Sequence, residues 1–415
     1  MSAPRPSSSQ ARSAATPSQR PAGQTPAQSP GSNPEPSAQS PGRSSSNLPH
    51  IASSGDSLTG SGSGLDIQRA RFDTFELASV LSHYELGIIH SIKEYPRGSR
   101  KSPKLLIRTE DDTFLLKRRA PGRDDPYKVA FCHSLQMYLA QRKFPLPHLI
   151  GTRADNNSML RFDGKIYELF EYIKGVSYDG SLKATSDAGK ALALFHKLLR
   201  DFQSPYTPPN GSYHAARSVD TALQQIPGTL QRIDPQGLVA TGDRLAQLVQ
   251  FLDESYHNAA ARAEQAGLPD WPQQIVHCDW HPGNMLFRGS RIVGVIDYDA
   301  ARLYQRIVDI ANGALQFSII GGGENPAKWP DYLDESRYKR FLRGYESVPD
   351  CLISRAELRI IPDLMIEALI AESVIPIAAT GSFARMDGTS FLLMVQRKVR
   401  WLEKQAQHLI QAIEG

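Results

Sequence analysis

Cysteine is scarce in this sequence. The chain contains three cysteines, Cys132, Cys278 and Cys351, which are an odd number and form no C-x-x-C pair. A disulfide framework and a structural zinc site both need clustered cysteines, so neither is expected. The composition fits a protein of the reducing cytoplasm.

Long apolar runs are also missing. The longest candidate, residues 364–379, is interrupted by Glu367, Glu372 and Pro376, whereas a membrane span needs roughly 20 consecutive apolar residues. The first residues, MSAPRPSSSQARS, have no apolar segment of the kind that secretory signals contain. We therefore expect no membrane partner.

The sequence has no large excess of charge of one sign. Its 47 basic residues are nearly balanced by 43 acidic ones, which gives a net charge of +4 and a pI near 8.8. Binding to nucleic acid is therefore not expected. The densest basic run, KRRAPGR at 117–123, is interpreted from charge density alone as a solvated loop, and a phosphate-facing site is the sharper alternative.

Residues 1–67 contain few apolar side chains and consist mostly of Ser, Pro, Gly, Ala and Gln. Such a segment cannot bury enough apolar surface to offset the entropy lost on ordering, so it is predicted to be a disordered tail. The rest of the chain is long enough for one unit with two lobes.

From 68 to 175 the pattern predicts an α+β layer. Two β-rich runs at 104–119 flank the acidic turn TEDD, and a helix of about fifteen residues follows and ends before Pro145. Two more strands flank the Asp163-Gly164 turn and close at Gly175.

After Gly175 the pattern becomes mainly helical. A helix is expected over 186–202 with Ser186 as its N-cap, another over 242–267, and more helices from 307 to the end. The Pro and Gly content of 201–240 predicts an irregular insertion. Three short strands are expected between 274 and 297.

The segment HCDWHPGN at 277–284 carries the densest set of reactive side chains. His277, Asp279 and His281 alternate, so on a single strand they would share a face and could bind zinc or iron, as in a metal-dependent hydrolase. Pro282 and Gly283 break such a strand immediately afterwards, which weakens this hypothesis.

Phosphoryl transfer accounts for more of these residues. That reaction needs a carboxylate that accepts the proton of the attacking hydroxyl and oxygen ligands for Mg²⁺. Asp279 supplies the first, and Asn284 and Asp297 supply the second. The sequence between Asn284 and Asp297 predicts a β-hairpin that brings these two residues side by side, and such hard oxygen donors suit Mg²⁺.

HCDWHPGN followed by VIDYD resembles the loop and metal-binding aspartate of the aminoglycoside phosphotransferase family, whose usual pattern is His-Gly-Asp-x-x-x-x-Asn. Cys278 replaces the glycine. The resemblance spans about 68–400 and extends to members such as type II homoserine kinases and spore-coat kinases. It implies an α+β, bilobal protein-kinase-like fold, with a small antiparallel-sheet N-lobe at 68–175 and a larger, mainly helical C-lobe at 176–415 that holds the catalytic loop and acceptor-binding helices.

The resemblance also implies an ATP- and Mg²⁺-dependent kinase that phosphorylates a hydroxyl of a small molecule. Lys117 would hold the nucleotide phosphates, and the backbone at Gly98 and Ser99 would cover them. The carbonyl group of Glu171 and the N–H of Ile173 would contact adenine.

Other motif residues are expected to support the site. His277 would brace the loop, and Asp309 in RIVDIA would support it from a following helix. His196 is expected to be a buried structural histidine, and Asp299 falls outside the motif and is interpreted as structural.

One departure from the family pattern concerns the helix that normally presents a glutamate to the strand lysine. His133 aligns with that glutamate, Gln136 lies one turn further on, and no acid occurs between Tyr127 and Asp155. Lys117 would then be held less firmly or pair elsewhere, which keeps open a pseudokinase or binding scaffold without transfer activity. The acceptor (homoserine, choline, a sugar or an aminoglycoside) and the oligomeric state are left open.

Overall fold

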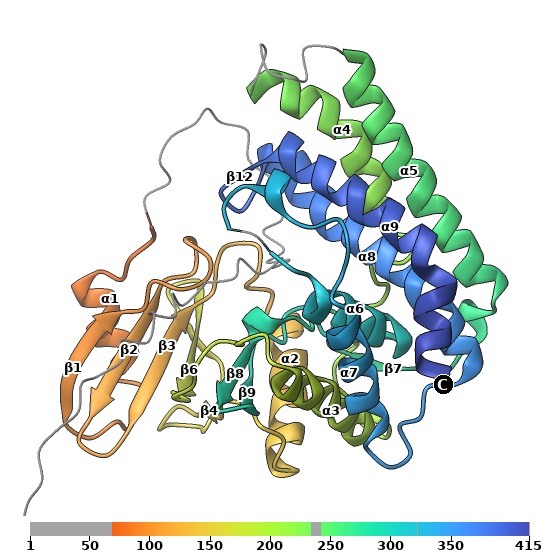
Figure 1. Ribbon diagram of the computed structural model, residues 1–415. Coiled ribbons are helices and arrows are strands. Elements are labelled where there is room, and N and C mark those ends of the chain that lie inside the picture. Colours follow the sequence, from red (N-terminus) through yellow and green to blue (C-terminus); the bar gives the residue numbers. More distant parts are fainter. Residues whose placement is uncertain (1–68, 234–241, 322, 415) are drawn as a thin grey trace, which may run out of the picture. The chain divides into compact units, whose positions relative to one another are not determined.

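The computed structural model describes residues 69–233, 242–321 and 323–414, all within one compact unit. The predicted tail at 1–67 lies outside the described residues. Figure 1 shows the following elements: α1 (Thr74–Leu81), β1 (Ile89–Glu94), β2 (Lys104–Thr109), β3 (Thr113–Arg118), α2 (Pro126–Gln141), β4 (Leu149–Ile150), β5 (Leu160–Phe162), β6 (Lys165–Glu171), α3 (Leu182–Leu199), α4 (Arg217–Ile233), α5 (Gly242–Gln265), β7 (Gln273–Val276), β8 (Met285–Arg288), β9 (Arg291–Val295), β10 (Arg302–Gln305), α6 (Ile307–Ser318), α7 (Glu335–Glu346), α8 (Arg355–Thr380), β11 (Ser382–Phe383), β12 (Met386–Asp387) and α9 (Gly388–Glu414).

The N-terminal part is built on an antiparallel sheet in the order β1-β2-β3-β6-β4, with β5 paired to β6. The predicted hairpins β2–β3 and β5–β6 are confirmed. In the register, Lys117 on β3 is the cross-strand partner of Lys104 on β2 and of Glu168 on β6. Side chains at directly opposed positions of a sheet point to the same face. The register therefore places these three residues on one face.

The predicted helix after the second hairpin is α2, 16 residues long. Asp125 caps its first turn by accepting hydrogen bonds from the backbone of Tyr127 and Lys128, and Pro126 occupies the first turn, where its missing N–H leaves no bond unmade. The helix ends at Gln141, just before the bend that leads to Pro145. His133 lies on its buried face, 2% exposed.

The opposite face of this sheet is covered by α1 (Figure 1). Val80 of α1 packs with Ile107 and Leu116, and all three are fully buried. Glu76 on the same helix receives two hydrogen bonds from Arg118, at 2.6 and 2.7 Å. Burial alone would raise the pKa of Glu76, but hydrogen bonds from Tyr167 and Arg118 and the charge of Arg118 lower it.

The C-terminal part is mainly helical, and its core joins α3, α5, α6, α7, α8 and α9. Helices α3 and α7 cross at two glycines. A Cβ on Gly189 would clash with the carbonyl oxygen of Phe341, and a Cβ on Gly344 would clash with that of Ser186. Backbone approaches backbone at this crossing, so neither position tolerates a side chain without a shift of one helix.

Two sequence predictions for this part are wrong. Helix α3 begins earlier than expected, because Ser181 and not Ser186 is the N-cap and accepts a hydrogen bond from the backbone N–H of Ala184. The stretch predicted to be irregular contains α4, which carries Pro227 inside it. Buried apolar residues at helical spacing, such as Val219 and Leu223, stabilise α4 against α8 despite this proline.

The helices that the structure describes include none with the length and hydropathy needed to cross a bilayer.

Candidate active site

The motif loop, residues 277–284, is positioned by a strand on each side. It follows β7, passes through a short 3₁₀ turn at Pro282–Asn284 and enters β8. The β8–β9 hairpin pairs Met285 with Val295, and the N–H of Ile296 donates to the carbonyl oxygen of Asn284 at 2.9 Å. Asp297 follows directly. The prediction that a hairpin returns Asp297 to Asn284 is therefore confirmed at the level of the backbone.

Asp309, at the start of α6, binds the loop backbone. Its carboxylate accepts the N–H of His277 at 2.6 Å and that of Cys278 at 2.7 Å, and lies 3.2 Å from Nε2 of His196. Asp309 is fully buried. Cys278 has φ of +56°, in the left-handed region. Glycine reaches this region without strain, which explains its frequency at this position in the family pattern.

The His277 side chain is enclosed by aromatic rings, and the bracing role expected for it stays a prediction. The side chain is fully buried, and among the described residues neither ring nitrogen has a hydrogen-bond partner. The ring packs against those of Phe195, Trp280 and Tyr298, at centroid distances between 5.2 and 5.8 Å. Burial lowers its pKa, so the ring is kept neutral.

Asp279 and Asn284 lie together, as the motif predicts. Nδ2 of Asn284 donates to Oδ2 of Asp279 at 2.8 Å and to its carbonyl oxygen at 3.1 Å. Because the amide nitrogen is directed at Asp279, the amide oxygen is directed elsewhere. Nε2 of His281 lies 3.5 Å from the other carboxylate oxygen of Asp279.

Asp297 lies close enough to two other carboxylates, those of Asp279 and Asp299, for their charges to act on it. Burial and then the charge of Asp299 raise the pKa of Asp297, and the positive charge of Lys117 partly offsets them. A divalent cation would relieve this repulsion, and the solvent-exposed carboxylate of Asp297 and the amide oxygen of Asn284 are suitable donors for Mg²⁺. The residues present thus fit a metal bound by Asn284 and Asp297.

Two lysines face this region from the sheet. Lys117 and Lys104 are cross-strand partners, and the charge of Asp297 acts on both. Burial and the charge of Lys117 lower the pKa of Lys104 to about 8. Gly98 adopts φ of +81°, and a Cβ there would approach Nζ of Lys104 to 2.9 Å. The loop containing Gly98 and Ser99 therefore lies over Lys104, where backbone N–H groups and two cations can meet phosphate.

The predicted adenine-binding segment follows β6. The N–H of Glu171 donates to the carbonyl oxygen of His148, and that of Tyr172 to Thr113, both at 2.9 Å. The ring of Tyr172 packs edge to face against the ring of Tyr95, which directly follows β1. The two ring centroids are 6.3 Å apart. Ile173 lies against the β8–β9 hairpin, since a Cβ on Gly294 would be 3.1 Å from its Cδ1. The proposed adenine contacts therefore lie between the sheet and this hairpin.

Sequence reasoning missed a buried charge cluster around Lys117. Nζ of Lys117 lies 3.4 Å from Oε2 of Glu168 and 3.7 Å from Oδ2 of Asp299. Nη2 of Arg119 donates to both acids, at 2.7 and 2.8 Å. Lys117 is therefore not without a carboxylate partner: the acid comes from strand β6. Nε2 of His133 lies 2.8 Å from Oε1 of Glu168.

One interpretation is corrected by this cluster. Arg119, in the basic run interpreted as a solvated loop, is only 6% exposed. Asp299 forms ion pairs with Lys117 on β3 and with Arg119, which directly follows that strand, and so links the segment after Asp297 to the sheet. The sequence carries no local signal for this pairing, because Glu168 meets Lys117 only through the register of β3 and β6.

Helix α8 places an acid near the loop. Glu372 is 9% exposed, and Oε2 of Glu372 accepts a hydrogen bond from Nε2 of Gln316. Burial, and then the charge of Asp279, raise its pKa well above the ordinary value. Asn312 is also buried, and its side-chain oxygen has no hydrogen-bond partner among the described residues. The side-chain oxygens of Glu372 and Asn312 thus provide hydrogen-bond acceptors near Asp279.

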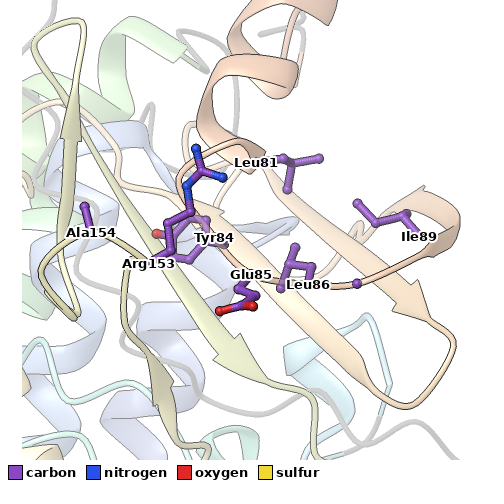
Figure 2. A pocket seen from close by; sticks show the side chains of 8 residues that line it. Leu81, Tyr84, Glu85, Leu86, Ile89, Arg153 and Ala154 are labelled. Carbon is purple, nitrogen blue, oxygen red and sulfur yellow. The ribbon is translucent and has the colours of Figure 1, made fainter.

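A metal centre built from His277, Asp279 and His281 is not supported. Within residues 69–233, 242–321 and 323–414, no group of three or more His, Cys, Asp or Glu side chains is arranged to hold a metal ion. A hollow of about 640 Å³ is bordered by Leu81, Tyr84 and Arg153, whose side chains are drawn in Figure 2. It is lined by none of the motif residues, so its size does not identify it as the reaction site.

Fold and motif together define a kinase-like phosphotransferase. A model of the phosphotransferase enzyme family, APH, matches residues 91–356. This chain belongs to that family, and it is a small-molecule phosphotransferase.

Curated relatives include homoserine kinases. That of Methylocella silvestris is 28% identical over 244 residues, which cover 57% of this chain and 67% of the relative. That of Sinorhizobium medicae is 25% identical over 227 residues, which cover 54% of this chain and 62% of the relative. Aligned segments thus span about two thirds of these relatives.

Solved structures share the fold. A microcompartment-associated aminopropanol kinase has a TM-score of 0.58 at 16% identity, covering 81% of this chain and 98% of its own. An amicoumacin kinase in complex with AMP-PNP and Ca²⁺ has a TM-score of 0.56 at 13% identity, covering 80% and 94%. These likenesses confirm the α+β kinase-like fold that the sequence predicts.

Proposed function

We propose that this protein transfers the γ-phosphate of ATP, with Mg²⁺, to a hydroxyl group of a small molecule. The observation that carries the proposal is the Asp279–Asn284 hydrogen bond of 2.8 Å in a loop whose hairpin leads directly to Asp297. This arrangement supports a proton-accepting carboxylate beside a pair of metal ligands, which phosphoryl transfer requires.

Each residue has a separate task in this proposal. Asp279, oriented by Asn284, accepts the proton of the acceptor hydroxyl. The side-chain oxygen of Asn284 and the Asp297 carboxylate hold Mg²⁺, which when bound neutralises charge on the phosphates. Lys117 and Lys104 hold the phosphates from the sheet side. The catalytic work is mainly positioning and electrostatic stabilisation.

We further propose that the acceptor is a small amino alcohol, with homoserine as the first candidate. Two observations support this acceptor. Glu372 is a buried acid whose pKa is raised by burial and by the charge of Asp279. The side-chain oxygen of Asn312 has no hydrogen-bond partner among the described residues. A substrate ammonium would allow Glu372 to ionise and would donate to both oxygens. The named relatives act on homoserine and aminopropanol, which are amino alcohols.

The test is consumption of ATP with Mg²⁺ over a panel that pairs each amino alcohol with its amine-free analogue, such as homoserine with 4-hydroxybutyrate. We expect turnover of at least one amino alcohol and at least tenfold lower kcat/KM for its partner. Asp279→Asn should abolish turnover and leave nucleotide binding intact. Nucleotide binding without transfer to any acceptor would instead identify a pseudokinase.

The Glu372→Gln variant tests the acceptor assignment separately. It keeps the shape of the side chain and removes its charge, so kcat/KM for the amino alcohol should fall by about ten- to hundredfold, or about 1.4 to 2.8 kcal/mol. The amine-free analogue should be affected much less. Equal losses for both compounds would refute the ammonium contact.

A further inference from the structure

The pairing of Lys117 with Glu168 is set by the β-sheet. The two residues are direct cross-strand partners on β3 and β6, and Glu168 is fully buried. In protein kinases the equivalent lysine pairs with a glutamate from a helix. Here both members of the pair lie on adjacent strands, so the strand register fixes their separation.

The two oxygens of Glu168 have different partners. Oε1 lies 2.7 Å from Arg119 Nη2 and 2.8 Å from His133 Nε2. Oε2 makes no hydrogen bond to any described residue and lies 3.4 Å from Nζ of Lys117. One oxygen therefore anchors the carboxylate, and the other is directed toward the lysine.

Charge balance explains why the acid is tolerated in this buried place. Glu168 and Asp299 are matched by Lys117 and Arg119, so the cluster contains two charges of each sign. A buried carboxylate without such partners would be strongly unfavourable. Burial alone would raise the pKa of Glu168, but the charges of Lys117 and Arg119 lower it well below its ordinary value.

His133 occupies the helix position at which the family pattern has an acid. Its Nδ1 lies 2.9 Å from Oγ of Ser158, and its Nε2 lies 2.8 Å from Glu168. A glutamate at 133 would place a second carboxylate against Glu168, and two carboxylates in contact repel each other. A helix acid and the strand acid therefore exclude one another, and a side chain that can donate a hydrogen bond to Glu168 suits the position.

We propose that Glu168 is the positioning residue for Lys117, replacing the helix glutamate of kinase-like proteins, and that Arg119 and His133 hold Glu168 in turn. This inference rests on the proposed function, because Lys117 has to be positioned only if it binds nucleotide phosphates. The proposal also explains how Lys117 can be positioned for the proposed transfer although α2 carries no acid.

The experiment measures Mg·ATP affinity by calorimetry, and kcat and KM for ATP, in Glu168→Gln and in the double variant His133→Glu/Glu168→Gln. Glu168→Gln should weaken Mg·ATP binding by about tenfold and lower kcat/KM for ATP by ten- to hundredfold, with KM for the acceptor unchanged. The alkaline limb of its pH–rate profile should move to lower pH, because Lys117 loses an anionic neighbour that raises its pKa. The double variant returns a carboxylate to the cluster from the helix and should recover part of the loss.

Glu76→Gln is the matched control. Glu76 is also a buried acid of the sheet part, but it pairs with Arg118, which points to the other face. This variant should lower the melting temperature and leave the affinity for Mg·ATP within twofold of the wild type. The inference is overturned if Glu168→Gln behaves in the same way, or if the double variant recovers nothing while remaining folded.

The two proposals can fail separately. A wild-type protein that binds Mg·ATP but phosphorylates no acceptor would refute the proposed function, and the role of Glu168 would still be decided by the binding constants. A wild-type protein that does not bind Mg·ATP would refute both.

Discussion

Replacing Asp309 by asparagine should destabilise the protein and slow the reaction. The carboxylate accepts two backbone N–H groups, at 2.6 and 2.7 Å, in a fully buried place. Hydrogen bonds to a charged group contribute about 1.5 to 3 kcal/mol each. Asparagine retains one oxygen and presents an NH₂ group to the second N–H, so one bond is lost and the other becomes neutral. We expect a loss of about 2 to 4 kcal/mol in the free energy of unfolding.

The effect on catalysis follows from chain connectivity. The two N–H groups belong to His277 and Cys278, and Asp279 is the next residue. A shift of the reacting group by about 1 Å can lower the rate about a hundredfold. We therefore expect kcat to fall by ten- to hundredfold, with a smaller change in KM for ATP.

The assays for Asp309→Asn are urea denaturation followed by fluorescence, and steady-state kinetics at a temperature at which the variant is folded. Asp350→Asn is the control, because Asp350 is an exposed acid paired with Lys197 at 3.1 Å. Surface pairs contribute at most about 1 kcal/mol, and asparagine tolerates the positive φ of this residue. An Asp309→Asn protein that unfolds at the same urea concentration as the control would refute the reasoning.

Further predictions concern the helix crossing and the nucleotide site. Gly189→Ala should lower the free energy of unfolding by about 3 kcal/mol or more, because its Cβ would meet the Phe341 carbonyl oxygen, whereas Gly228→Ala, with no described atom within 4 Å, should be neutral or stabilising by up to about 1 kcal/mol; thermal denaturation of both compares them. Lys104, with a pKa of about 8, is charged below that pH and loses its charge above it. KM for ATP should therefore rise between pH 7 and 9 in the wild type and stay flat in Lys104→Arg, since arginine remains charged; an equal rise in both would exclude Lys104 as the cause. Glu372 has a raised pKa, so its contribution to stability should fall as the pH rises above the ordinary pKa of 4.5, where the unfolded chain ionises and the buried acid stays protonated; Glu372→Gln should lose this dependence in urea titrations that start below that pH.

Sequence periodicity predicted the elements whose patterns are uninterrupted. The hairpins around the TEDD and Asp163-Gly164 turns and helix α2 were predicted because turn residues and apolar spacing agree there. Helix α4 was missed because Pro227 and Gly228 lie inside it, and its packing against α8 overrides their low propensity. The N-cap of α3 was misplaced by five residues, as two serines precede or enter the same apolar run.

Some residues of the candidate site were predicted from the sequence, and others were not. Asp279, Asn284 and Asp297 lie in one short segment, so their spacing along the chain was enough to predict their proximity. Glu168 could not be found from spacing, because it is 51 residues from Lys117 in sequence and meets it only through the β3–β6 register. Arg119 was misjudged because charge density along the chain says nothing about which side of a strand faces the core.

The placement of the lysine and its acid on neighbouring strands bears on regulation. Where the acid lies on a helix, rotation of that helix breaks the ion pair and switches a kinase off. In this protein Lys117 and Glu168 lie on strands that are joined by the backbone hydrogen bonds of one sheet, so movement of α2 would remove the His133 contact to Glu168 but would not separate the two strands. The register of β3 and β6, and not the orientation of a helix, therefore sets the distance between this lysine and its acid.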